Sequence, residues 1–317
     1  SPYAASILGH LGADIVKVEP PEGDPTRKVV RNGPGGSFIA YGSGKKSVCI
    51  DLRTSAGYAA FGRLLKSADI LLQNLSPRST RQLKVTEADC WAINPDLLYC
   101  HIRGYGPGPQ EDDIASNPII EAATGVMYVN QIDGRPTRLG PSYLDMFAGA
   151  YAVIGILGTL LAAKSSEQRS NTQKSGGAPS SKSLELGLYE AGLHVAAKDL
   201  AGAQLNADMA EGTFAPEFVK PGYGAYRTSD GRWIYLLMLG DHHWKKFCSA
   251  MGLPEGDDPS LATAHQRQQR RPFVEQLVEK VSGALTYDEA ARRLQAVGFG
   301  CTEVMAPDEV LDAPQAS

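Results

Sequence analysis

The chain has 317 residues, of which 43% are hydrophobic and 21% are charged, and its formal net charge at pH 7 is -4. This is the composition of an ordinary globular protein, and the length allows one large domain or two of common size. The acidic balance and the lack of any run of five basic residues argue against a nucleic-acid partner.

Five cysteines occur, and none of them forms a CxxC pair. This odd number is typical neither of a disulfide framework nor of a zinc site, and it favours a reducing intracellular compartment such as the cytoplasm, a mitochondrion or a peroxisome. The chain begins at Ser1 rather than at a methionine, so we expect that a preceding piece, with any targeting signal, was trimmed.

Strand-like and helix-like runs alternate over the first hundred residues. Apolar, β-branched runs predict strands at 13–19, 46–52, 69–74 and 96–103, and amphipathic runs predict helices at 3–12, 54–66, 77–83 and 87–94. This alternation indicates βαβ units and a parallel sheet. Because ligands of such sheets bind at the carboxyl ends of the strands, we expect the functional edge at the loops that follow these four strands.

The middle of the chain predicts helices at 119–125 and 146–163, with a turn at 133–134 between them. The second helix is 18 uncharged residues long, which is the lower limit for crossing a membrane, but its many Gly and Ala residues favour a buried helix instead. Residues 165–183 lack apolar periodicity and predict an exposed, mobile insertion. Residues 184–204 return to a helical pattern.

The last third has a different organisation. Two strands around an Asp-Gly turn at 226–239 predict an antiparallel hairpin. Helices at 242–252, 271–283 and 287–297 and a strand within 299–305 follow. The predicted domains are a large α/β domain at 1–204, a linker at 205–225, a small α+β domain at 226–306 and a segment returning to the large domain at 307–317.

Many segments, in this order, resemble the class III CoA-transferases (the CaiB/BaiF family), which includes formyl-CoA and carnitine-CoA transferases and also 2-methylacyl-CoA racemases. They include SPYAASILGHLGADIVKVEPPEGDPTR, GKKSVCIDLRTSAG, ADILLQNLSPRS, INPDLLYCHIRGYGPGP, DGRPTRLGPSYLDMFAGAYAVIGILGTLLAA and GAYRTSDGRWIYLLMLGDHHWKKFCSAMGLP. The resemblance covers nearly the whole chain, with both ends of the family missing. It implies a Rossmann-like large domain, a smaller α+β domain and an interlocked homodimer.

Gly140, Asp145 and Gly149 match the family's G-x-x-x-x-D-x-x-x-G setting before a long apolar helix. The resemblance implies that Asp145 attacks the donor thioester, forms a mixed anhydride and then carries CoA as an aspartyl thioester. Because a carboxylate is a weak nucleophile, such a site must desolvate Asp145, keep it ionised and exclude water. The structural alternative is a helix N-cap, and the two roles are compatible because a helix start favours the ionised form.

The resemblance also implies a CoA-binding set. Its members are Arg53, Asn74, Leu75, Ser76, Arg78 and Arg81. Each arginine taken alone is more typical of a solvated surface charge, but guanidinium groups suit bidentate contact with phosphate and the cluster at the strand ends favours that role. A family arginine aligns with Gln82, which leaves open whether Arg81 replaces it.

Tyr105 and Asn117 complete the substrate pocket that the resemblance implies, together with Gly140. The family's transferases usually have an acidic residue where Asn117 stands, so we expect this amide to bear on acceptor choice. Its racemases have a histidine one position earlier, at Ser116 here, and serine is not suited to moving an α-proton. The shielding loop of the family would fall at 206–224, where only three glycines occur.

The leading hypothesis is a CoA-transferase that moves CoA between an acyl-CoA thioester and a carboxylic acid. Two alternatives remain open: a 2-methylacyl-CoA racemase of the same family and a non-catalytic acyl-CoA-binding relative. We expect CoA as a substrate rather than a resident cofactor. We also expect no metal site, no membrane partner and a second copy of the chain as partner.

Overall fold

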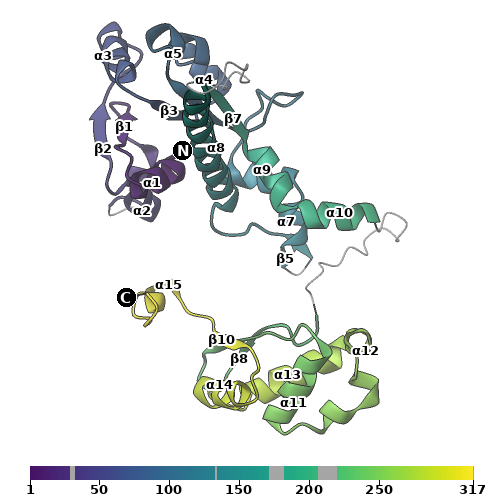
Figure 1. Cartoon of the computed structure of the whole chain (residues 1–317). Helices are drawn as coiled ribbons and strands as arrows, with labels where there is room; N and C mark the ends of the chain where they lie inside the picture. The colour runs from purple at the N-terminus through teal and green to yellow at the C-terminus, as the bar shows by residue number, and fades with distance from the viewer. Residues whose placement is uncertain (29–32, 133, 171–181, 206–219, 317) are drawn as a thin grey trace. The chain divides into compact units, whose positions relative to one another are not determined.

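The computed structural model describes residues 1–28, 33–132, 134–170, 182–205 and 220–316, with the backbone alone at 166–170. The chain forms two compact units, Ser1–Met209 and Ala210–Ser317 (Figure 1). The division between them falls within the predicted linker at 205–225. The proposed mobile insertion at 165–183 and the shielding loop lie largely outside the described residues.

The first unit contains parallel strands, as predicted. β1 (Val16–Glu19) pairs with β2 (Lys46–Cys49), and β4 (Leu98–Arg103) lies between β3 (Ile70–Gln73) and β7 (Ser183–Gly187). The expectation of one sheet was wrong for the described strands, which form two separate parallel sheets.

β7 was not predicted, because residues 184–204 were assigned to a helix. The strand pairs in parallel with β4 from Tyr99↔Ser183 to Arg103↔Gly187. Only then do α9 (Leu188–Val195) and α10 (Ala197–Leu205) begin. The short alternation of Leu184 and Leu186 with polar neighbours was the available signal for a strand.

Helices cover both faces of β4. Its Leu98, Cys100 and Ile102 side chains join a core with α1 (Pro2–His10), α8 (Tyr143–Ser170) and α9. Tyr99 points to the opposite core with α3 (Ser55–Lys66) and α5 (Glu87–Ile93). This alternation follows from the period of two in a strand, and burial on both faces is typical of a parallel sheet.

Side-chain caps define where the shorter helices begin. Thr54 accepts a hydrogen bond from the Gly57 N–H at the start of α3, and Thr86 forms a capping box at the start of α5. Ser76 caps α4 (Pro77–Gln82). The first unit also contains α6 (Asn117–Ala123), α7 (Val126–Val129) and α2 (Gly36–Gly42), of which α2 was not predicted. A short antiparallel pair is formed by β5 (Gln131–Ile132) and β6 (Arg135–Pro136).

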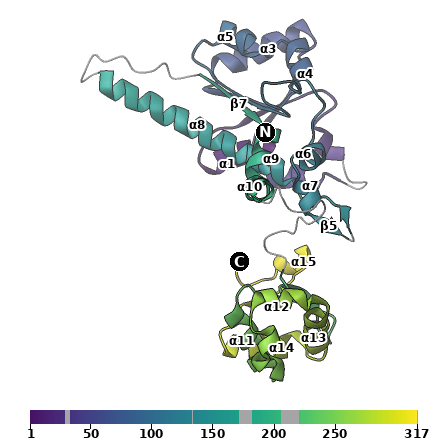
Figure 2. The same ribbon diagram turned by 90° about the vertical axis from the view of Figure 1, so that its right-hand side faces the viewer.

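The long helix α8 begins and ends outside its predicted bounds of 146–163, and only one of its faces is buried. Leu144, Ala148 and Ala152 are fully buried, whereas Ile154 is 65% and Leu161 67% exposed. Figure 2 shows its far end extending away from the rest of the unit. By length and composition the helix could cross a membrane, and 28% of its most apolar window is buried. The expectation of a buried helix was therefore only half correct.

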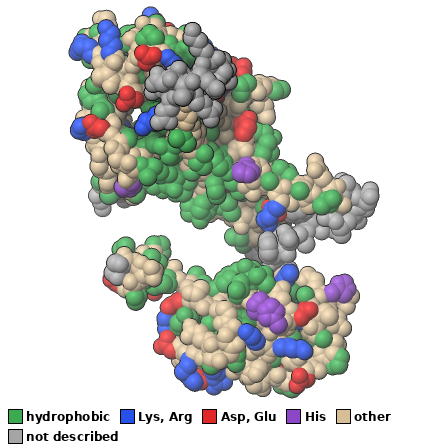
Figure 3. Space-filling model, in the orientation of Figure 1, with side chains coloured by type: hydrophobic (Ala, Val, Ile, Leu, Met, Phe, Trp, Pro, Cys, Tyr) green, Lys and Arg blue, Asp and Glu red, His purple; other side chains and the backbone are tan. Residues whose placement is uncertain are grey.

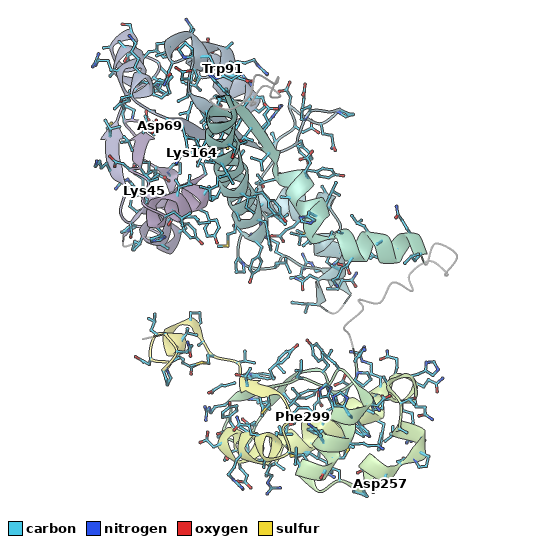
Figure 4. The ribbon with its side chains drawn as sticks, in the orientation of Figure 1. Lys45, Asp69, Trp91, Lys164, Asp257 and Phe299 are labelled. Carbon is cyan, nitrogen blue, oxygen red and sulfur yellow. The ribbon has the colours of Figure 1, made fainter. Side chains whose placement is uncertain are left out.

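The second unit has an antiparallel sheet in the order β10–β9–β8, and the predicted hairpin is confirmed as β8 (Gly224–Arg227) and β9 (Trp233–Leu236). β10 (Cys301–Glu303) supplies the third strand. The predicted helices correspond to α11 (Asp241–Met251), α13 (Arg271–Gly283) and α14 (Tyr287–Ala296). Two short helices, α12 (Ala264–Gln269) and α15 (Pro307–Val310), were not predicted. Phe299, labelled in Figure 4, lies in the core that α11, α13 and α14 share with the sheet.

Candidate active site

The carboxyl ends of β3, β4 and β7 lie side by side, because the three strands run parallel. The loop after β4 is held close to α9 at this edge. The Tyr189 N–H donates to the Gly104 carbonyl at 3.0 Å, and the Gly106 N–H donates to both carboxylate oxygens of Glu190 at 3.1 and 3.2 Å. A Cβ at Gly106 would lie 2.5 Å from a Glu190 oxygen, so the Glu190 carboxylate would have to move if residue 106 carried a side chain.

Asp145 lies within the first turn of α8 rather than ahead of the helix. Its side chain is exposed, whereas Leu144 beside it is fully buried. No described residue donates a hydrogen bond to its carboxylate or forms an ion pair with it. The interpretation of Asp145 as the N-cap was therefore wrong within the described part of the chain.

The start of α8 is capped instead by Asn117 from α6. The Asn117 Oδ1 accepts hydrogen bonds from the Leu144 N–H at 3.0 Å and from the Asp145 N–H at 3.3 Å. The Asn117 amide in turn donates to Glu121, whose other carboxylate oxygen accepts from the Leu139 N–H at 3.1 Å. Asn117 is 3% and Glu121 0% exposed, so this network is internal. Two residues from α6 thus take over the capping role and leave the Asp145 carboxylate unused.

The surroundings of Asp145 favour its protonated form. Although the residue as a whole is exposed, its carboxyl group is partly desolvated, which raises its pKa above the ordinary aspartate value, and the negative charge of Glu121 adds to this shift. A more basic carboxylate is a better nucleophile once ionised. The helix N-terminus beside it favours the ionised form at neutral pH.

The start of α1 lies against the same part of α8. A Cβ on Gly149, one turn beyond Asp145, would lie 3.1 Å from the Tyr3 ring, which explains the glycine. The Ser1 hydroxyl donates to the Asn74 side chain at 2.8 Å, and Lys45, labelled in Figure 4, donates to the Pro2 carbonyl at 2.7 Å. The end of β3 and the start of α8 are thus linked through these residues.

The other predicted residues at the end of β3 have structural partners. The Leu75 carbonyl oxygen accepts a hydrogen bond from Nε2 of the His101 ring at 2.9 Å, and burial lowers the pKa of that histidine. Ser76 caps α4 by accepting from the Ser79 N–H at 3.2 Å. His101 is therefore a buried histidine whose ring has a hydrogen-bond partner.

The predicted arginines follow strands β2 and β3 along the chain, and all three are exposed. Arg53, after β2, donates to both oxygens of Asp51 at 2.7 and 3.1 Å and to Glu22 at 3.1 Å. Arg81 is 3.3 Å from Asp112, and Arg78 lies beside it on α4. No described contact joins any of these arginines to Asp145.

Arg103, which was not among the predicted site residues, ends β4 at the expected functional edge. Its side chain is 11% exposed and pairs with Glu185 of β7 at 3.3 Å and with Glu111 at 3.7 Å. Its Nε is buried without a hydrogen-bond partner. The signal was its place as the last residue of a strand at that edge.

The two remaining pocket candidates are Tyr105 and Gly140. Tyr105 is buried, and its ring centroid lies 5.5 Å from that of Tyr189, so its ring is part of the core beneath the loop. Gly140 has a φ of 82°, a left-handed conformation that favours glycine just before α8. Their contact with substrate stays a prediction. Among the described residues there is no cluster that could hold a metal ion.

The model of one protein family matches residues 1–317, and its description is CoA-transferase family III. The chain belongs to this family. It is therefore a CoA-transferase, and the resemblance seen in the sequence is confirmed.

Curated members of the family are similar along most of this chain. A succinyl-CoA–L-malate CoA-transferase alpha subunit of Chloroflexus aurantiacus is 31% identical over 92% of this chain and 68% of its own length. A succinyl-CoA–D-citramalate CoA-transferase of the same organism is 30% identical over 99% and 77%. A formyl-CoA:oxalate CoA-transferase of Streptomyces avermitilis is 27% identical over 98% and 78%. These relatives are longer than the chain described.

Solved structures support the fold. A CAIB/BAIF family protein from Brucella suis has a TM-score of 0.82 and 25% identity, covering 99% of this chain and 82% of its own. A Mycobacterium tuberculosis protein at 24% identity has a TM-score of 0.78 and shares the fold. The mixed α/β fold with parallel sheets is thus that of the family.

Proposed function

We propose that this CoA-transferase works through a covalent intermediate on Asp145. An Asp145 oxygen attacks the thioester carbonyl of an acyl-CoA, a C–O bond forms, the C–S bond breaks and the CoA thiolate leaves. The thiolate then attacks the aspartyl carbonyl of the anhydride and releases the donor acid, leaving an aspartyl-CoA thioester. The acceptor carboxylate reverses these steps and leaves as the new acyl-CoA.

One observation carries this proposal. Asn117 satisfies the N–H groups of Leu144 and Asp145, so the Asp145 carboxylate is free of the capping role that its position would otherwise give it. Its raised pKa and its place in the first turn of α8 suit a carboxylate that must be reactive and yet ionised.

The exposed arginines at the ends of the strands fit the phosphates of CoA. Arg53 offers a guanidinium group held in place by Asp51, and Arg78 and Arg81 follow on the helix that Ser76 caps. We propose that the Asn74–Ser76 segment lies along the pantetheine arm and that Tyr105 bounds the thiol end.

Trapping with hydroxylamine tests the covalent step. Incubation with succinyl-CoA and hydroxylamine should convert Asp145 to its hydroxamate, which peptide mass spectrometry would locate. Asp145→Asn is the matched control and should give no label. Normal CoA binding without a hydroxamate would favour the acyl-CoA-binding alternative. Deuterium exchange at the α-carbon of a 2-methylacyl-CoA without an acceptor acid would favour the racemase.

We further propose that a second copy of the chain covers the exposed apolar face of α8. This face is formed by Phe147, Ile154, Leu157, Leu160 and Leu161, all more than a third exposed. Figure 3 shows hydrophobic side chains gathered over this helix. Apolar stripes of this kind on a helix are typical of interfaces.

Light scattering should therefore give twice the chain mass of 33.8 kDa. The double variant Ile154→Asp/Leu161→Asp should be monomeric, because two buried charges would face the partner. Leu205→Asp, at another highly exposed leucine on α10, is the control and should stay dimeric. A monomeric wild type, or a double variant of unchanged mass, would contradict the proposed interface.

A further inference from the structure

Glu121 is a fully buried carboxylate without a described cation beside it. Each of its oxygens accepts one hydrogen bond, from the Asn117 amide and from the Leu139 N–H. Burial of a carboxylate without a cation costs free energy, so the stability of the fold alone does not explain an acid at this position.

The carboxylate fixes the orientation of the neighbouring amide. A carboxylate can only accept hydrogen bonds, so the Asn117 NH2 group must point toward Glu121. The Asn117 oxygen is thereby turned toward the N–H groups of Leu144 and Asp145. With the amide reversed, NH2 would face two N–H donors, and the start of α8 would lose its cap.

We propose that Glu121 is a positioning residue for Asp145, acting through the orientation of Asn117 and through its own negative charge. This inference rests on the proposed role of Asp145. It also explains why residue 117 is an amide rather than an acid. The acidic member of the hydrogen-bonded pair is Glu121, one helical turn further along α6. Among the described side chains, the charged group that acts on Asp145 is Glu121 on α6.

The donors and acceptors of this network predict that exchanging the acid and the amide between positions 117 and 121 preserves it. In Glu121→Gln, an oxygen can still accept from Asn117, but the Gln NH2 then faces the Leu139 N–H. In Asn117→Asp, two carboxylates face each other. In the double variant, Asp at 117 accepts from Leu144, Asp145 and the new glutamine amide, whose oxygen accepts from Leu139. Every bond of the wild type is then restored, and only the bond between residues 117 and 121 has its donor and acceptor exchanged.

The experiment measures acyl transfer and pH dependence for the wild type, both single variants and the double variant. We expect each single variant to lower kcat at least about 10-fold, with KM for acyl-CoA changed less than about threefold, and the double variant to return kcat to within about threefold of wild type. The acid limb of the kcat profile should move to lower pH in Glu121→Gln, since the nearby negative charge is lost, and return in the double variant.

Asp89→Asn, which removes a capping carboxylate from α5, is the control and should leave kcat and the acid limb unchanged. The inference is overturned if the two single effects simply multiply in the double variant, or if Glu121→Gln has the kcat and acid limb of wild type. Recovery of unfolding temperature without recovery of kcat would also overturn it, because it indicates a purely structural pair. Failure of the aspartyl mechanism would appear separately, as transfer that survives in Asp145→Asn.

Discussion

Asp145→Ala is expected to lower the rate of CoA transfer at least about 1000-fold while CoA still binds with nearly wild-type affinity. The variant removes the proposed nucleophile, whereas the arginines that we propose for phosphate binding lie on other elements. Steady-state transfer from succinyl-CoA to a panel of dicarboxylic acids, with calorimetric binding of CoA, would measure both quantities.

Asp145→Asn and Asp145→Glu separate chemistry from structure. Asparagine keeps the size of the side chain and the backbone N–H bond to Asn117 but cannot form an anhydride, so its activity should equal that of the alanine variant. Glutamate keeps the carboxylate but displaces it by one methylene, and should recover part of the rate. Transfer by Asp145→Asn at more than a few per cent of wild type would contradict covalent catalysis at this residue.

Glu19→Gln is expected to destabilise the first unit and to weaken its sensitivity to acid. The Glu19 carboxylate is 4% exposed and accepts from the Arg27 guanidinium at 2.8 and 3.0 Å, from the Asp24 N–H at 3.0 Å and from the Ser47 hydroxyl at 3.0 Å. These bonds, above all those from Arg27, lower its pKa from 4.5 to about 2. The side chain holds the turn after β1.

The sign of the pH dependence follows from that lowered pKa. Because the folded pKa is depressed, the contribution of Glu19 is complete above the unfolded value of 4.5 and is lost as the pH falls toward 2. Its size is about 3 kcal/mol at most, because each tenfold change in an acid dissociation constant corresponds to roughly 1.4 kcal/mol.

Urea unfolding at several pH values between 7 and 3 would measure this contribution. Glu19→Gln should be less stable at pH 7, and its unfolding free energy should fall less between pH 5 and 3 than that of wild type. Asp69→Asn, at an exposed acid labelled in Figure 4, is the control and should follow the wild-type curve. Equal acid slopes in wild type and Glu19→Gln would refute the assignment.

Local patterns predicted most elements of the fold. β-branched runs predicted β1 to β4, and Thr54, Ser76 and Thr86 stand where α3, α4 and α5 begin. The Asp-Gly turn predicted the hairpin of the second unit. These elements could be predicted because each sequence signal involves only a few neighbouring residues.

β7 and the faces of α8 depend on distant residues. Ser183–Gly187 forms a strand because β4 offers a parallel edge from more than eighty residues away, which overrides a weak local preference. The apolar residues of α8 are similar all round, so only its neighbours determine that Leu144 and Ala148 are buried while Ile154 and Leu161 are not.

The sequence by itself determined the family, the alternation of strands and helices, and the candidate aspartate, because each is a property of residue types in order along the chain. Only the tertiary structure decided what caps α8. That cap comes from Asn117, with Glu121 behind it, on a helix more than twenty residues earlier. Hydrogen bonds between side chains and distant backbone groups depend on how elements meet in space, and no local pattern contains that information.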